Sequence, residues 1–215
     1  MTKTLSYAAL EKLGRVRLSP NFFFRDFLYS EISNFHGIPN VPHHPDIAIE
    51  AARGLCVNLL EPLTTAFGKV SIRSAYRSPE VNQFGNESGL NCARNDANFG
   101  GHIFDYRDPE RGLGAMACIV INSYIDIFDE TGDWPALAWF IHDHLNYSQM
   151  YFYPKLCAFN ISWSETPKRR IDSYVTPKGT LTKPGMENHD GDHSSEYDTP
   201  YFHDALTRLK GHTSA

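Results

Sequence analysis

The 215-residue chain lacks any apolar run close to the roughly 20 residues that a membrane-spanning helix needs. Residues 1–17 also lack the continuous apolar core of a secretory signal, because charged residues such as Lys3 and Glu11 interrupt the short apolar groups. These two absences lead us to expect a cytoplasmic protein without a membrane span.

Paired cysteines, an excess of basic residues and internal repeats are also missing. The four cysteines form no Cys-x-x-Cys pair, which argues against a disulfide framework in a chain of this size. Lys and Arg number 20 against 25 Asp and Glu, a net charge of −5, which disfavours a non-specific nucleic-acid binder. The composition, 41% apolar and 21% charged, is that of an ordinary globular domain.

Hydrophobic spacing predicts the following elements. Helices are expected over 1–18, 46–66, 114–128 and 134–142. Strands are expected over 70–76 and 102–106, with a hairpin formed by 147–153 and 156–163 and a long Asn- and Gly-rich loop over 83–101. Composition shifts toward Pro, Gly, Lys and Asp near the C-terminus. We therefore predict a globular domain over 1–175 and a polar tail over 176–215 that wraps the domain or is partly disordered.

The segment at the end of the first predicted strand is the most specific in the chain. It runs Ser-Ile-Arg-Ser-Ala-Tyr-Arg-Ser-Pro over 71–79, with Asn82 three residues later, after Gly-Ile-Pro-Asn at 37–40 and Phe67-Gly68. This order resembles the opening half of the D-Ala-D-Ala carboxypeptidase and hedgehog-like superfamily of zinc peptidases. The resemblance covers roughly 20–175. It implies an α+β fold with an antiparallel sheet flanked by helices.

The resemblance also assigns positions to the metal ligands of that family. The family motif Ser-x-His-x-x-Gly-x-Ala-x-Asp aligns with 96–105, where Gly101 and Asp105 match and Asn98 replaces the ligand histidine. The last ligand, in a Trp-x-His-x-Ser strand, is replaced by Asn160. The general-base glutamate has no counterpart.

These substitutions change the chemistry that the family resemblance implies. A neutral Asn amide is a poor zinc donor, and without the metal and the glutamate no water is activated for hydrolysis. Zinc is therefore a doubtful cofactor, and the metal site is impaired or rearranged. Asn98, Asp105 and Asn160 either converge as hydrogen-bonding groups for a ligand or only satisfy one another.

The strand-turn segment supplies the remaining candidates for binding substrate. In the resembling family the arginine at the position of Arg77 contacts a substrate carboxylate, a role that suits the planar guanidinium fork. We place Arg73, Ser74, Tyr76 and Asn82 in the same candidate site. The alternative is a structural salt bridge that pins the long loop.

Other residues suggest a replacement metal site. His142 and His144 share a face if the segment is a strand but point apart if it is a helix. His102 and Asp105 are also close in sequence, although i and i+3 fall on opposite faces of a strand. A third group, around His189 to His193, is typical either of metal ligands or of a solvated loop.

Three functions follow from these observations. The first is a metallopeptidase-type hydrolase of peptidoglycan peptides, with a rearranged metal site. The second is a non-catalytic domain whose cleft binds a peptide or a glycan. The third is an intracellular regulatory protein, of phage or mobile-element origin, that uses the same scaffold. A peptide or peptidoglycan fragment is the expected partner, and we expect neither a nucleic acid nor a membrane.

Overall fold

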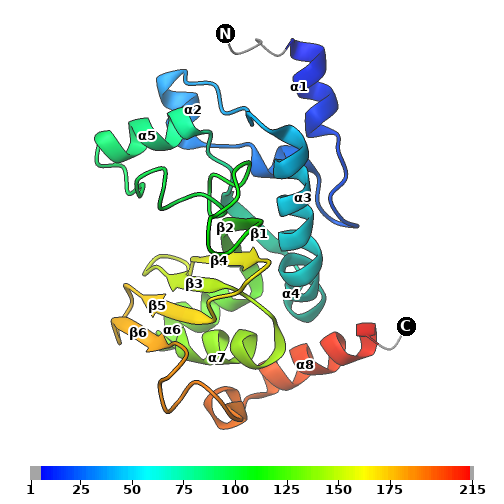
Figure 1. Ribbon diagram of the computed structural model, residues 1–215. Helices are drawn as coiled ribbons and strands as arrows, with labels where there is room; N and C mark the ends of the chain where they lie inside the picture. Colours follow the sequence, from blue (N-terminus) through cyan, green and yellow to red (C-terminus); the bar gives the residue numbers. More distant parts are fainter. Residues whose placement is uncertain (1–5, 214–215) are drawn as a thin grey trace.

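The computed structural model of the protein describes residues 6–213, and six strands form one open sheet in the order β1-β2-β4-β3-β5-β6 (Figure 1). The strands are β1 Val70–Ser74, β2 Gly114–Ile121, β3 Gln149–Phe152, β4 Phe159–Ser164, β5 Arg170–Ser173 and β6 Gly179–Thr182. All neighbouring strands are antiparallel except β3 and β5. The α+β class is therefore confirmed. The expected antiparallel sheet is mostly found; its one parallel pair arises because the connection 165–169 carries the chain past β3 to its far edge.

The helices precede, interrupt and follow the strands. The α-helices are α1 Tyr7–Gly14, α2 Glu31–His36, α3 Pro45–Leu55, α4 Glu61–Phe67, α5 Pro79–Glu87, α6 Ile125–Thr131, α7 Pro135–His144 and α8 Pro200–Thr213. Short 3-10 turns are η1 Phe24–Phe27, η3 Asn122–Tyr124 and η4 Ser194–Tyr197, and the π-helical turn η2 spans Cys56–Leu60. Among residues 6–213 we find no helix with the length and apolar character needed to cross a membrane.

One face of the sheet packs against helices α3, α6 and α7 (Figure 1). The side chains on this face include Ala117, Ile161, Met150 and Ile171, which are neighbours across four strands and are all buried. Their partners in the core are the aromatic side chains of α7 and the apolar side chains of α3. Burial of this face supplies the hydrophobic stabilisation of the domain.

The opposite face of the sheet carries polar side chains. Cys118, Asn160, Tyr151 and Asp172 are in register across β2, β4, β3 and β5, so they form one row on this face. All four are partly exposed. The sheet thus separates an apolar core from a polar surface on which a ligand can bind.

The predicted helix over 114–128 is wrong for its first half. Residues Gly114–Ile121 form β2, which lies between β1 and β4, and only the second half becomes η3 and α6. The residues of β2 are apolar or small on both faces of the sheet, so the strand reads as an unbroken apolar run that periodicity cannot distinguish from a buried helix.

Three other predicted elements also differ from the structure. The loop expected to begin at 83 begins after Glu87, because Ser78 caps α5 with Pro79 in its first turn. The strand expected over 102–106 is instead a series of turns. The helix expected over 1–18 is shorter, Tyr7–Gly14, and residues 1–5 lie outside the described residues.

The helix expected over 46–66 is continuous but contains a π-helical turn. This turn, Cys56–Leu60, ends just before Pro62 in the first turn of α4. Proline lacks the amide proton and crowds the preceding turn, so a locally wider helix accommodates it. Pro62 therefore lies within a continuous helical segment rather than at its end.

The segment after residue 175 lies against the domain along most of its described length. It adds β6 to the sheet edge, and α8 lies along α4 in Figure 1. Phe202 of α8 is buried against Phe67 and Phe140, with ring centroids 6.1 and 5.4 Å apart. This packing joins the C-terminal segment to the core.

Candidate functional site

A cleft of about 1160 Å³ opens over the polar face of the sheet. Its floor is made by β1, β2 and β4 through Ser74, Met116, Cys118 and Asn160. Its walls are the start of α2, the loop that follows α5 and the turn 153–158 between β3 and β4. The lining residues therefore come both from the sheet and from α2 with the loop after α5, which Figure 1 draws above the sheet.

Two arginines from the strand-turn segment line this cleft. Arg73 is the fourth residue of β1, and Arg77 follows the strand, where its amide donates to the carbonyl of His102. The Arg77 guanidinium lies 3.3 Å from Asn82 Oδ1 and 2.7 Å from Cys92 Sγ. Within the described part of the chain neither guanidinium has a carboxylate partner. The predicted alternative, a salt bridge that pins the loop, is therefore absent.

Asn98 lines the cleft, but its amide is already engaged. Its Nδ2 donates to Asn82 Oδ1 at 2.8 Å, and its Oδ1 accepts from the amide of His102 at 3.1 Å. Asn82 in turn donates to Asn95 Oδ1 at 2.8 Å. This network fixes the long loop beneath Arg77, so Asn98 and Asn82 shape the site.

Asn160 lies on the floor of the cleft beside Cys118, its register partner on β2. Its Nδ2 donates to the Tyr153 hydroxyl at 3.1 Å. Burial raises the pKa of Tyr153 to about 12 and that of Cys118 to about 11, although Arg73 and Arg77 oppose the shift at Cys118. Both groups are therefore neutral at pH 7, and neither offsets the charge of the arginines.

Asp105, the third position of the expected zinc set, does not line the cleft. It is fully buried, and its Oδ2 accepts from the amides of His43 at 2.7 Å and His44 at 3.4 Å. The side chain of Tyr76, another predicted site residue, is also fully buried and does not line the cleft. Burial raises the pKa of Asp105. Asn98 and Asn160 therefore face one cleft, and Asp105 faces another part of the core.

His102 is the one predicted metal candidate in the cleft. Its Nδ1 lies 2.6 Å from the carbonyl oxygen of Ala75, so Nδ1 carries the proton and Nε2 presents a lone pair. Burial lowers the pKa of His102 well below its usual value, and the charge of Arg77 adds to this effect. The imidazole is thus a neutral hydrogen-bond acceptor at the cleft wall.

The other two metal candidates do not form a pair. His142 and His144 lie on α7, and a helix directs residues two apart to different sides. His144 contacts Phe140 and the Tyr197 hydroxyl. His142 instead joins Asp143 and His193, the one group of three metal-ligating side chains found among residues 6–213. His193 belongs to the predicted cluster at 189–193 in the C-terminal segment. The sequence therefore indicated both clusters as metal candidates, but it did not indicate that His193 contacts the end of α7.

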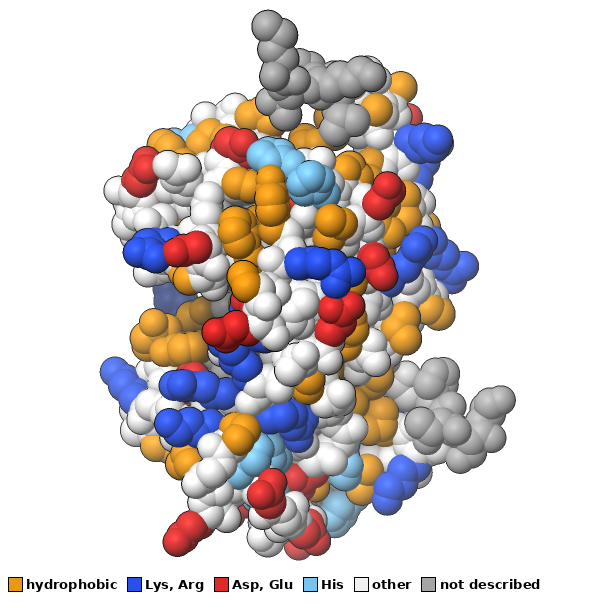
Figure 2. Space-filling view, in the orientation of Figure 1, with side chains coloured by type: hydrophobic (Ala, Val, Ile, Leu, Met, Phe, Trp, Pro, Cys, Tyr) orange, Lys and Arg blue, Asp and Glu red, His pale blue; other side chains and the backbone are white. Residues whose placement is uncertain are grey.

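Charged side chains make the cleft and its surroundings moderately positive. Lys155 lines the cleft with the two arginines, against the carboxylates of Glu31 and Asp129. Figure 2 shows further Lys and Arg side chains gathered over the region of β5 and β6, where Lys178 and Lys183 are exposed.

Comparisons of the chain with protein-family models, with curated proteins and with solved structures give no match. The chemistry of the cleft is therefore inferred from its own side chains. The cleft offers two guanidinium groups that have no carboxylate partner among the described residues, a neutral imidazole and the partly exposed amide of Asn160.

Proposed function

We propose that the cleft binds a peptide that ends in a free carboxylate, on a carboxypeptidase-like scaffold whose metal site is impaired. The observation that carries this proposal is the pair Arg73 and Arg77, which line the cleft without a carboxylate partner among the described residues. Guanidinium groups bind carboxylates through charge-assisted hydrogen bonds. The peptidoglycan-type peptide is the ligand class that the family resemblance implies.

Two further features support binding over hydrolysis. Asn98 and Asn160 are neutral amides, and the Asp105 carboxylate is held by the amides of His43 and His44 outside the cleft. The side chains at these three positions therefore do not offer the cleft three zinc ligands. His102 supplies an acceptor for a peptide N–H, so the ligand is bound through its carboxylate and its amide.

Isothermal titration with N-acetyl-D-Ala-D-Ala and with its C-terminal amide tests the proposal. The acid is expected to bind, and the amide to bind about 10- to 100-fold more weakly, the equivalent of about 1.5–3 kcal/mol for charged hydrogen bonds. Arg77→Gln and Arg73→Gln should weaken binding of the acid, whereas Arg15→Gln on α1, paired with Glu11, should not. Equal binding of acid and amide would remove the basis of the proposal. Release of D-Ala on prolonged incubation would contradict its non-catalytic part.

A second candidate ligand, a glycan, is favoured by an aromatic cluster next to the cleft. Tyr151 lies 4.5 Å from Tyr174 and 5.8 Å from Tyr153 between ring centroids, and Tyr153 also lines the cleft. Tyr174 is 56% exposed, so its ring is accessible to a sugar. Titration with a chitin oligosaccharide of wild type and Tyr174→Ala tests this function. Absence of saturable binding to the wild type would exclude it for this class of sugar.

A further inference from the structure

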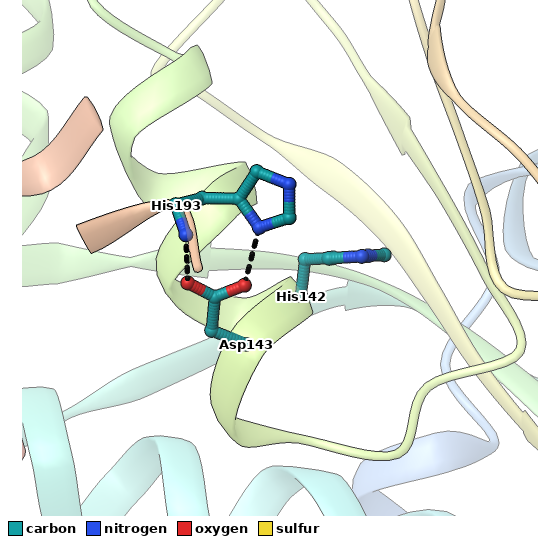
Figure 3. A group of neighbouring side chains, drawn as sticks. All are labelled: His142, Asp143 and His193. Atoms are coloured by element: carbon teal, nitrogen blue, oxygen red, sulfur yellow. Dashed lines mark hydrogen bonds and ion pairs between the residues drawn. The ribbon is translucent and has the colours of Figure 1, made fainter. Parts of the chain in front are cut away.

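The C-terminal segment brings a histidine to the end of α7, away from the cleft. There His142 and Asp143 of α7 meet His193, as Figure 3 shows. One potential ligand atom from each of the three lies within 4.8 Å of the other two. His142 is 5% exposed, and the side chains of Asp143 and His193 are each 11% exposed. The three groups are thus gathered at a nearly buried point.

Both ring nitrogens of His193 contact oxygen atoms that can only accept a hydrogen bond. Nδ1 lies 2.6 Å from Asp143 Oδ1, and Nε2 lies 3.0 Å from the carbonyl oxygen of Asn188. Both partners are acceptors, and a neutral imidazole has only one N–H. In a neutral ring, one of these two contacts therefore places a nitrogen lone pair against an oxygen lone pair, an arrangement that a cation bound between them would relieve. The ring cannot turn away easily, because it stacks on Trp139 with centroids 4.1 Å apart.

The surroundings of the two rings are those of metal ligands. Metal-bound histidines usually place their second nitrogen against a carbonyl, carboxylate or hydroxyl, which fixes the ring. His193 Nε2 has this contact with Asn188, and His142 Nδ1 lies 2.7 Å from the Tyr147 hydroxyl. His142 Nε2 then remains as the ligand, in exchange for its 2.9 Å contact with the carbonyl of His189.

We propose that His142, Asp143 and His193 bind a divalent ion of the zinc type, which fastens the C-terminal segment to α7. Two imidazoles and a carboxylate are a donor set that zinc accepts, with a further position for water or for the nearby His189 carbonyl. Asp143 also accepts from the Tyr197 hydroxyl at 2.8 Å, so its orientation is fixed from a second side. The site lies on α7 and the C-terminal segment, so it is independent of the function proposed for the cleft.

Zinc binding by the full chain tests this proposal. After treatment with EDTA and dialysis, isothermal titration with Zn²⁺ at pH 7.5 and metal analysis of the dialysed complex are expected to give one ion per chain. Zinc should also raise the melting temperature and slow proteolytic cleavage between 183 and 199. His193→Ala and His142→Gln should each weaken binding at least tenfold.

Two matched controls make the result specific. His144→Ala removes the neighbouring imidazole of α7, and Asn160→Ala alters the cleft. Both should bind zinc as the wild type does. Far-UV circular dichroism identifies any variant that fails to fold, in which case the milder His193→Gln replaces it. Failure of the wild type to bind stoichiometric zinc, or unchanged binding in folded His193 variants, would overturn the proposal.

Discussion

The close approach of α3 to β4 gives the sharpest quantitative prediction. Gly54 of α3 faces the ring of Trp163, and a Cβ added there would lie 2.3, 2.4 and 2.6 Å from three ring carbons. Unstrained carbon contacts lie at about 3.5–4.0 Å, so Gly54→Ala must move the helix or the ring by about 1 Å. Asn160 of the cleft floor lies three residues before Trp163 on the same strand.

The expected loss of stability follows from two opposing effects. Overpacking a core contact costs about 1–3 kcal/mol. Replacing glycine by alanine in a helix returns about 1 kcal/mol. Because the added Cβ meets three ring carbons at once, we expect the overpacking cost to lie near the upper end of that range. The net decrease in the free energy of unfolding is then about 1–2 kcal/mol.

Urea unfolding followed by far-UV circular dichroism measures this change. Gly211→Ala on α8 is the matched control, because an added Cβ there meets nothing within 4 Å and should leave stability unchanged or raise it by up to about 1 kcal/mol. Trp163→Leu should relieve the clash, so Gly54→Ala should cost less in that background. A Gly54→Ala variant as stable as the wild type would refute the close contact.

Two further predictions concern the polar core. Burial raises the pKa of Asp105, so the folded chain holds a proton there more tightly than the unfolded chain. Wild-type stability relative to Asp105→Asn should therefore be greatest below about pH 4 and fall as pH rises through the raised pKa, by at most about 1.4 kcal/mol per pH unit. Parallel urea titrations between pH 4 and 8 check this, and a pH-independent difference would contradict it. Asn40→Ala removes three hydrogen bonds, to the carbonyls of Leu28 and Tyr76 and from the amide of Ser78, and should cost about 1–3 kcal/mol; an unchanged urea midpoint would show that these bonds contribute nothing.

Local patterns in the sequence predict some elements well and others poorly. The hairpin of β3 and β4 was predicted because its two strands are adjacent in sequence and rich in aromatic residues. The helix α7 was also predicted, although its side chains are buried on nearly every side. β2 was mistaken for a helix because a central strand shows no alternation in polarity. That error also hid Cys118, which reaches the cleft only because it pairs with Asn160 on β4.

The same limit applies to the candidate sites. The strand-turn segment places Arg73 and Arg77 in the cleft because both lie within one short stretch of chain. Asp105 was expected beside Asn98, but the turns that replace the predicted strand direct its carboxylate to the amide of His43 instead. His193 lies 50 residues from Asp143, and no local pattern indicates a contact at that separation.

The edge of the sheet at β6 affects whether two copies of this protein can pair through their strands. β6 is only four residues long, and the sequence around it reads Pro-Lys before the strand and Lys-Pro after it. Proline offers no amide for a further strand, and a lysine at each end places like charges against any second copy that approaches in register. The proline and lysine at each end of β6 therefore disfavour pairing of this strand with a strand of a second copy.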